Sequence, residues 1–392
     1  MRRIAADLIF PISSKPLRDK VLLLSDEGQV ISIKEKSEFT EGELETYAGA
    51  LVPGFVNVHC HLELSHLKNT FPEKTGLPEF LMQVTKHQGA DIAEKQIAME
   101  KADEEMYRNG IVAVGDISNS TDSFAIKARK NIYYHTFAEL LSLNPNKVFE
   151  AIQKGEKLLA SARGFGIHAS LAPHAPYSLS VELLKIISSH CYENGKPTTI
   201  HMLESNDENE FYMQGSGLIR KLYRELNIPI DDFFSPTKKT SLESLLPFMN
   251  RNVKTMLVHN TIATAWDAEW AEDMHPNLYW CFCPNANLYI EDRLPDIPQL
   301  LQQVQYITIG TDSLASNHQL SVLEELKTIQ NRFPEIRTED MMRWATLYGA
   351  KFLGIDERFG SFEVGKFPGV TLIEGIDLNT LNISAAKPRR II

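Results

Sequence analysis

The sequence contains few cysteines and no long hydrophobic run. Four cysteines in 392 residues are too few for a disulfide framework, and unpaired thiols persist in a reducing compartment. No apolar run reaches the roughly 18 residues that a membrane helix needs. The N-terminal run Ile4–Phe10 is interrupted by Asp7 and ended by Pro11. These absences argue against a secreted or membrane protein, and we expect a cytoplasmic localisation.

Basic residues are also fewer than acidic residues. Forty Lys and Arg residues face 51 Asp and Glu, which gives a formal net charge of −11 at pH 7. An excess of negative charge repels phosphate backbones and anionic lipid headgroups. We therefore expect neither nucleic acid nor a membrane as a partner. The 43% of hydrophobic residues is ordinary for a globular protein and too high for a disordered chain.

Short β-like runs occur at both ends of the chain. Lys20–Leu24 and Gln29–Lys34 flank the turn Asp26-Glu27-Gly28, a pattern typical of a hairpin. A similar stretch, Gly360–Ile373, lies near the C-terminus. These runs are too few to form a core separately. We predict that residues 1–50 and 360–392 together build one small β-sandwich domain.

Residues 51–359 show a repeating rhythm, in which an apolar run ends on polar residues and a stretch of helical periodicity follows. Parallel neighbours need crossover connections, and eight such strands close a barrel. We predict an α/β fold, a (β/α)8 TIM-type barrel, because a doubly wound open sheet would carry a Gly-rich nucleotide turn that is absent here. The eight runs are Ala50–His61, Ile111–Ser118, Ile132–Glu139, Gly166–His174, Pro197–Glu204, Thr255–Asn260, Leu278–Asn285 and Tyr306–Asp312. The predicted helices include Asp91–Asn109, Ser180–Asn194, Ser321–Phe333 and Thr338–Leu353.

Potential ligands and proton carriers stand where these runs end. Barrel active sites lie at the C-terminal ends of the strands, so residues far apart in sequence meet there. The sequence therefore predicts one shared site. Its candidate residues are His59, His61, His174, His201, Glu204, His259 and Asp312.

His59-Cys60-His61 is the first metal-ligand pattern. On a strand, residues two apart project to the same side, so both imidazoles can face one point while Cys60 turns away. An isolated His-x-His is more often incidental. Here the pair follows the apolar run Val52–Val58, which favours a metal site.

A third imidazole and two carboxylates complete the candidate set. His201 is followed by Glu204, giving a ligand and a nearby proton carrier for a metal-activated water. Asp312 offers an oxygen ligand, although an Asp at this place can also cap the next helix. Three imidazoles with one carboxylate suit a single divalent transition metal, Zn²⁺ or Fe²⁺, better than Ca²⁺ or Mg²⁺. Zinc is favoured.

A thiolate-bound metal is the competing interpretation. His61-Leu62-Glu63 matches one half of a zinc deaminase signature whose other half is Pro-Cys-x-x-Cys. Cys281-Phe282-Cys283-Pro284 has the wrong spacing and order. Its cysteines are more simply small apolar strand residues.

The ordered set of motifs closely resembles the amidohydrolase superfamily, in the branch of cytosine, guanine and adenosyl-nucleoside deaminases and triazine chlorohydrolases. The similarity runs from about residue 50 to 330, and the terminal β-segments fit the small domain of this family. The motifs, in chain order, are Pro53-Gly54-Phe55-Val56-Asn57-Val58-His59-Cys60-His61, Ala172-Pro173-His174-Ala175-Pro176-Tyr177, His201-Met202-Leu203-Glu204, Val258-His259-Asn260, Cys283-Pro284-Asn285-Ala286-Asn287 and Gly310-Thr311-Asp312-Ser313-Leu314-Ala315-Ser316-Asn317.

The resemblance implies roles for the site residues. Glu204 corresponds to the acid/base that carries a proton from the attacking water to a substrate ring nitrogen, and His259 to the residue that orients water and substrate. The run Gly166–His174 lacks the lysine that bridges two metals in binuclear members, so one metal is implied. The implied metal ligands are His59, His61, His201 and Asp312. Candidate substrate contacts are Glu63, His174, Asn287, Ser316 and Arg220.

The chain also departs from the family pattern. Ala286 replaces a usual serine, and Pro368-Gly369 stands where many relatives have Ala-Asp. Residues 205–254 form an insertion too long for an ordinary βα loop, and we expect a lid-like element there. It contains candidate substrate-recognition residues, namely Phe211, Tyr212, Met213, Arg220 and Arg224.

The resemblance favours a metal-dependent aminohydrolase acting on an amino-substituted nitrogen heterocycle or an adenine-type nucleoside, with aminodeoxyfutalosine as one candidate. A cyclic amidohydrolase and a triazine chlorohydrolase are alternatives, because fold and ligands do not separate them. A phosphatase-like binuclear hydrolase is a further alternative, which predicts about two metals per chain rather than one. A catalytically silent barrel scaffold is the non-enzyme alternative. The expected partner is a small heterocyclic substrate, and a homodimer is left open.

Overall fold

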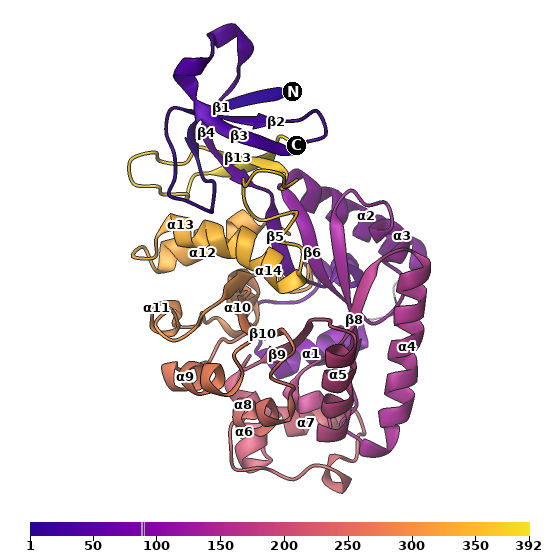
Figure 1. Ribbon diagram of the computed structural model, residues 1–392. Helices are drawn as coiled ribbons and strands as arrows, with labels where there is room; N and C mark the ends of the chain where they lie inside the picture. The colour runs from indigo at the N-terminus through magenta and orange to yellow at the C-terminus, as the bar shows by residue number, and fades with distance from the viewer. Residues whose placement is uncertain (88, 90) are drawn as a thin grey trace.

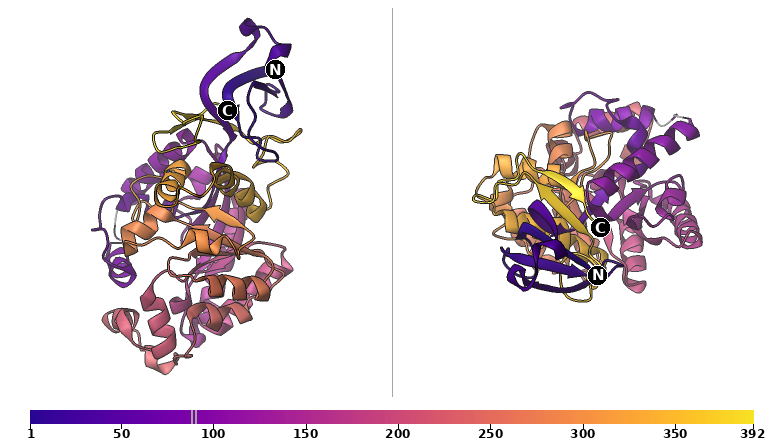
Figure 2. Two further views of the ribbon diagram at one scale, coloured as in Figure 1. Left: turned by 90° about the vertical axis from the view of Figure 1, so that its left-hand side faces the viewer. Right: turned by 90° about the horizontal axis from the view of Figure 1, so that it is seen from above.

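The two ends of the chain share one β-sheet. The computed structural model describes residues 1–87, 89 and 91–392, and this sheet has the strand order β14-β13-β4-β1-β2-β3. Figures 1 and 2 place it at one end of the molecule, beside both termini. Its strands are β1 (Arg2–Ile9), β2 (Lys20–Leu24), β3 (Val30–Glu35), β4 (Glu45–Pro53), β13 (Val370–Glu374) and β14 (Lys387–Arg390).

The predicted hairpin of β2 and β3 is confirmed, whereas a second sheet facing it is not seen among the described residues. The two strands pair antiparallel, and Gly28 takes the left-handed φ of 89° that the turn requires. Side chains from loops cover the sheet instead of another sheet. Phe362 packs on one face, and Phe39 and Leu44 pack on the other.

Eight parallel strands form the larger part of the fold, in two four-stranded sheets. The sheets meet at both edges. The amides of Thr311 and Asp312 donate to the His59 carbonyl oxygen at 3.0 Å, and the His201 amide donates to that of His174 at 2.9 Å. Pairing along these edges is limited, so the described residues do not form one continuous ladder. The strands are β5 (Phe55–Cys60), β6 (Ile111–Ser118), β7 (Tyr133–Leu140), β8 (His168–Pro173), β9 (Thr198–Met202), β10 (Thr255–His259), β11 (Leu278–Phe282) and β12 (Ile307–Ile309).

The first predicted run, Ala50–His61, is corrected: it is two strands rather than one. β4 ends at Pro53 in the terminal sheet, and β5 begins at Phe55 in the eight-stranded part. Gly54 joins them at a close approach, because a Cβ there would lie 2.2 Å from Val112 Cγ1. The residues on both sides of Gly54 are apolar, so the hydrophobic pattern does not show where the chain changes sheets.

Three of the predicted helices occur as expected. α2 (Ile92–Arg108), α5 (Val181–Glu193) and α12 (Val322–Arg332) lie within their predicted ranges. Ser180 accepts a hydrogen bond from the Leu183 amide at 3.2 Å at the start of α5. The predicted helix Thr338–Leu353 is divided into α13 (Thr338–Arg343) and α14 (Gly349–Leu353) by the π-helical turn Trp344–Tyr348.

Further helices complete the layer around the strands (Figure 1). None of the helices among the described residues is long and apolar enough to span a membrane. The additional α-helices are α1 (Leu77–Lys86), α3 (Phe124–Lys127), α4 (Val148–Gly164), α6 (Asn206–Gln214), α7 (Gly217–Glu225), α8 (Ser241–Leu245), α9 (Ala265–Met274), α10 (Pro284–Glu291) and α11 (Ile297–Leu300). The 3-10 helices are η1 (Lys36–Glu38), η2 (Glu41–Glu43), η3 (Leu62–Leu67), η4 (Pro145–Lys147), η5 (Pro176–Ser178), η6 (Ile230–Asp232) and η7 (Leu246–Phe248).

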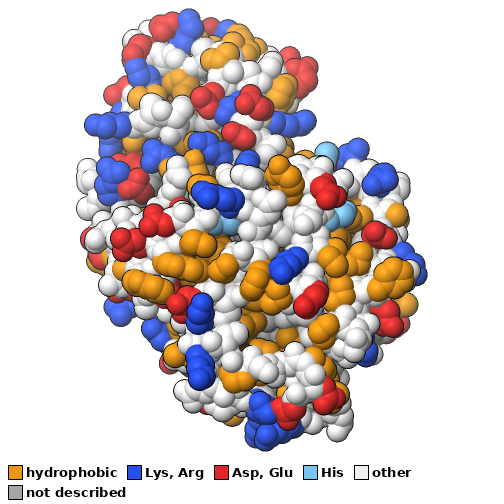
Figure 3. Space-filling view, turned by 60° about the horizontal axis from the view of Figure 1, so that its bottom comes forward, with side chains coloured by type: hydrophobic (Ala, Val, Ile, Leu, Met, Phe, Trp, Pro, Cys, Tyr) orange, Lys and Arg blue, Asp and Glu red, His pale blue; other side chains and the backbone are white. Residues whose placement is uncertain are grey.

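The insertion 205–254 is a packed helical element at the end of the molecule opposite the terminal sheet (Figure 1). Phe211 and Phe234 stack with ring centroids 4.1 Å apart. The Tyr212 hydroxyl donates to the Pro176 carbonyl oxygen at 2.8 Å, and the Tyr223 hydroxyl donates to that of Tyr177 at 2.5 Å. The insertion is therefore tied to the segment that follows β8. The surface toward this end mixes hydrophobic, acidic and basic side chains (Figure 3).

Candidate active site

The two histidines that follow the apolar part of β5 meet the carboxylate that follows β12. His59 Nε2 and His61 Nε2 lie 3.2 Å apart. Asp312 Oδ1 lies 3.7 Å from His59 Nε2 and 3.5 Å from His61 Nε2. The predicted convergence of these three residues is therefore observed.

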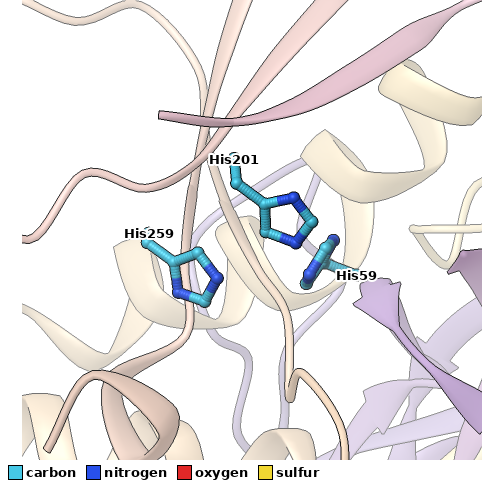
Figure 4. A group of neighbouring side chains, drawn as sticks. All are labelled: His59, His201 and His259. Atoms are coloured by element: carbon cyan, nitrogen blue, oxygen red, sulfur yellow. The ribbon is translucent and has the colours of Figure 1, made fainter. Parts of the chain in front are cut away.

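His201 at the end of β9 and His259 at the end of β10 join this cluster. The His201 ring centroid lies 4.9 Å from that of His59 and 5.4 Å from that of His259. Figure 4 shows the three rings turned toward a common region from separate segments of the chain. His59, His201 and His259 each offer a nitrogen within 4.8 Å of the others.

Hydrogen bonds fix the tautomers of two of these rings when they are neutral. His201 Nδ1 lies 2.7 Å from the His174 carbonyl oxygen, so this nitrogen carries the proton and Nε2 keeps its lone pair. His259 Nδ1 lies 2.9 Å from Asn287 Oδ1. The Asn287 amide nitrogen donates to the His259 carbonyl oxygen at 3.2 Å, which orients the amide. His259 Nε2 is therefore also an acceptor.

The donor set fits a divalent metal. Burial lowers the pKa of His61 and of His201, so both rings are neutral and able to ligate. Burial opposes ionisation of Asp312, but the neighbouring rings of His59, His61 and His259 outweigh this effect and hold the pKa of Asp312 well below its usual range. Buried neutral imidazoles and one carboxylate are the ligands that zinc and similar ions bind.

Glu204 stands beside the cluster on a turn that follows β9. Its Oε1 lies 3.6 Å from His259 Nε2, and the residue is 5% exposed. Burial raises the pKa of Glu204 well above its usual range, and the charges of Asp312 and Glu208 add to the rise. A carboxyl group in this state can hold a proton near neutral pH and release it to a bound partner.

Comparison with known proteins agrees with this geometry. The model of the amidohydrolase family matches residues 50–392. The chain belongs to the amidohydrolase family. An adenosine deaminase of Helicobacter pylori is 26% identical over 344 residues, which cover 84% of this chain and 79% of that protein.

Solved structures show the same fold. The aminofutalosine deaminase of Helicobacter pylori in complex with methylthio-coformycin has a TM-score of 0.84, with 22% identity and full coverage of both chains, 100% and 100%. An adenosine deaminase from Xanthomonas campestris with bound zinc has a TM-score of 0.75 and 20% identity, covering 98% of this chain and 89% of that chain. These likenesses establish a TIM-barrel-type α/β fold for this amidohydrolase.

Asn287 and Ser316, two of the predicted substrate contacts, form hydrogen bonds with other site residues. The Ser316 hydroxyl donates to Asp312 Oδ2 at 2.6 Å, and Asn287 bonds to His259 as described above. These bonds leave Asp312 Oδ1 facing the histidines. Direct substrate contacts of Ser316 and Asn287 stay predictions.

The other three predicted contacts have different partners. His174 belongs to it, because its ring centroid lies 5.0 Å from that of His201. Glu63 accepts hydrogen bonds from the amides of Asn119, at 3.1 Å, and Ser120. Arg220 pairs with Asp231 and with the Gly215 carbonyl oxygen inside the insertion. A substrate role for each of the three stays a prediction.

Glu139 is a site residue that sequence reasoning missed. It is 4% exposed near the end of β7, and its Oε1 lies 3.9 Å from His201 Nδ1. Asn119 Nδ2 donates to the other carboxylate oxygen at 3.0 Å. Glu139 ends the third apolar run, as other site residues end theirs, and that position was the available signal.

Asp116 and Lys127 form a second group that the sequence did not reveal. Both side chains are fully buried, and Lys127 Nζ lies 2.6 Å from Asp116 Oδ2. Asp116 Oδ1 accepts a hydrogen bond from the Leu62 amide at 2.8 Å. Leu62 directly follows His61, so this ion pair supports the segment that carries a metal-ligand candidate.

Proposed function

We propose that this amidohydrolase is a zinc-dependent aminohydrolase that removes the amino group of an adenine-type nucleoside. Water supplies the replacing oxygen, and ammonia is released. The observation that carries the proposal is the placement of Glu204, a buried carboxyl group with a raised pKa, 3.6 Å from His259 and beside the histidine and Asp312 cluster. Deamination of a nitrogen heterocycle needs such a proton donor next to a source of nucleophile.

Four residues would hold the ion: His59, His61, His201 and Asp312. When bound, a divalent metal would polarise a water molecule and lower its pKa toward neutrality. Zinc is favoured because the donors are three nitrogens and one carboxylate oxygen. The zinc bound in the Xanthomonas campestris protein supports the same choice.

The chain's own residues then move the protons. Asp312, ionised by its surroundings, accepts a proton from the attacking water, while Glu204 donates its proton to a ring nitrogen of the substrate. His259 Nε2 accepts a hydrogen bond and orients the water. The water oxygen bonds to the carbon that carries the amino group, and the C–N bond breaks. The departing nitrogen gains a proton relayed by Glu204 or Asp312 and leaves as ammonia.

The substrate class follows from the relatives rather than from the cluster alone. The proteins compared above are named as adenosine deaminases and an aminofutalosine deaminase. We infer that this chain acts on an adenine nucleoside, with aminodeoxyfutalosine as one candidate. A cyclic amidohydrolase or chlorohydrolase would use the same cluster, so product analysis has to separate them.

The proposal is tested by measuring ammonia release from aminopurines, pteridines and adenine nucleosides. Glu204→Gln keeps the size of the side chain but loses the proton, so kcat should fall about 10²- to 10⁴-fold. Glu225→Gln, the same change on the exposed end of α7, should keep the wild-type rate. Equal rates for wild type and Glu204→Gln on every converted substrate would refute the role of Glu204.

A further inference from the structure

Glu208 is a buried carboxylate that faces the turn behind Glu204. It lies in the first turn of α6 and is 0% exposed. Its Oε1 accepts a hydrogen bond from the Leu203 amide at 2.9 Å, and its Oε2 accepts one from the Glu204 amide at 3.3 Å. The Ser241 hydroxyl of α8 also donates to Oε1. One side chain therefore binds the two amides that lead into the proposed acid/base.

The turn that Glu208 holds is strained. Leu203 has a left-handed φ of 51°, which residues with a Cβ rarely adopt. Such a conformation persists where the surrounding structure fixes it. The Ile262 amide donates to the Leu203 carbonyl oxygen at 3.0 Å from the other side. Hydrogen bonds with Glu208 and Ile262 thus fix the amide and the carbonyl group of Leu203.

We propose that Glu208 is a positioning residue that aims the Glu204 carboxyl group at the substrate. The inference deepens the proposed function and rests on it. Because the hydroxyl of Ser241 completes the contacts of Glu208, α8 of the insertion supports the acid/base through this carboxylate. The insertion then acts as a scaffold for catalysis, in addition to any part in substrate recognition.

The electrostatic surroundings give Glu208 a measurable signature. Burial raises the pKa of Glu208 to about 7, while hydrogen bonds from Ser241, Leu203 and Glu204 favour its charged form. The titratable groups that face it are Glu204, Tyr177 from η5 and Tyr212 from α6. Burial raises the pKa of both tyrosines well above its ordinary value, so they remain neutral when Glu208 titrates.

The proposal predicts a specific effect of pH. Below the pKa of Glu208 the side chain loses its charge, and its hydrogen bonds with the Leu203 and Glu204 amides become weaker. We therefore expect kcat to fall as pH decreases through about 7. Ser241→Ala removes one donor to the charged form, raises this pKa and should shift the acid limb of the kcat profile to higher pH. A role in packing alone would not move that limb.

The test combines kinetics with amide hydrogen exchange on the whole protein. Glu208→Gln should lower kcat about 10- to 100-fold, a range typical of residues that orient a reactive group, with little change in KM. The Leu203 and Glu204 amides should exchange faster than in wild type. Glu210→Gln is the matched control in the same helix, because the Glu210 carboxylate accepts a hydrogen bond from Ser216 rather than from the turn. This variant should leave kcat and the exchange of both amides unchanged.

Three results would overturn the proposal: an unchanged kcat in Glu208→Gln, unchanged exchange of the two amides, or an acid limb that does not move in Ser241→Ala. The two inferences fail separately. Absence of ammonia release from every substrate by wild type would refute the proposed function. The exchange of the two amides would still decide whether Glu208 holds this turn, because that measurement needs no substrate.

Discussion

At the scale of single residues, the site depends on strained backbone conformations and on side chains whose orientation is fixed by hydrogen bonds. His259 and Asp312 have left-handed φ values of 75° and 56°, which are costly for residues with a Cβ and cluster at functional sites. Their side chains are fixed by Asn287 and Ser316. Proton positions and donor directions are therefore set before a ligand binds.

Gly310→Ala should disturb the metal site. Gly310 directly follows β12, and a Cβ there would lie 2.7 Å from His59 Cβ and 3.0 Å from Cys281 Sγ and Cys283 Sγ. The added methyl group has to displace His59, so metal affinity should fall about 10-fold or more. Metal titration of the purified variant measures this.

Gly164→Ala is the control, because nothing lies within 4 Å of a Cβ at that position. It should keep the wild-type metal affinity. Wild-type affinity in Gly310→Ala would show that the close approach beneath His59 does not constrain the site.

At the scale of elements, strand ends deliver the ligands and a buried ion pair holds one of the connecting segments. Asp116 near the end of β6 binds both Lys127 of α3 and the amide of Leu62 in η3. Breaking a buried pair leaves an uncompensated charge, which costs more than the pair itself contributes.

Lys127→Met should lower the free energy of unfolding by about 3–5 kcal/mol, because Asp116 remains buried without its partner. Asp116→Asn combined with Lys127→Met should recover part of this loss. Denaturant unfolding measures both. Lys130→Met, an exposed change three residues later, serves as the control. A loss below about 1 kcal/mol in Lys127→Met would contradict a structural role of the pair.

The strands and helices follow from local sequence pattern and were predicted, whereas most side-chain contacts do not follow from it and were not. Alternation of apolar runs and capped helices indicated the eight strands and α2, α5 and α12. The same pattern did not separate β4 from β5, because the chain stays apolar while it changes sheets at Gly54. It also placed His59, His61 and Asp312 at strand ends, which was enough to bring them together.

Hydrogen-bond partners were beyond sequence reasoning. Asn287 and Ser316 follow strand ends and were expected to bind substrate, yet their nearest partners are His259 and Asp312. Position along a strand shows which residues gather at the site, whereas the bonding atom depends on rotamers and on loop geometry. Glu139 was missed although it obeys the same positional rule.

At the scale of the whole molecule, buried carboxylates connect segments that are distant in sequence and make stability depend on pH. Glu325 of α12 accepts hydrogen bonds from the Asn285 amide, the Asn285 side chain and the Asn317 side chain. Burial nevertheless raises the pKa of Glu325 to about 8. In the unfolded chain the pKa is near 4.5, so the folded form binds this proton more tightly.

The stabilisation from this proton is fully present below pH 4.5 and is lost as pH rises to about 8. Tm should therefore fall across this window, and Glu208, with a pKa of about 7, should add to the fall. Calorimetry over the window should give a flatter dependence for Glu325→Gln than for wild type. An equally steep decline in the variant would contradict the assignment to Glu325.

Metal content measured together with ammonia release tests the central claim most directly. We expect wild type to bind about one divalent ion per chain, and His201→Ala to lose it, because four protein ligands form the site. Glu204→Gln should keep the ion and lose ammonia release. Wild type without a divalent ion at neutral pH, or His201→Ala with undiminished metal and activity, would contradict a single-metal aminohydrolase built on this cluster.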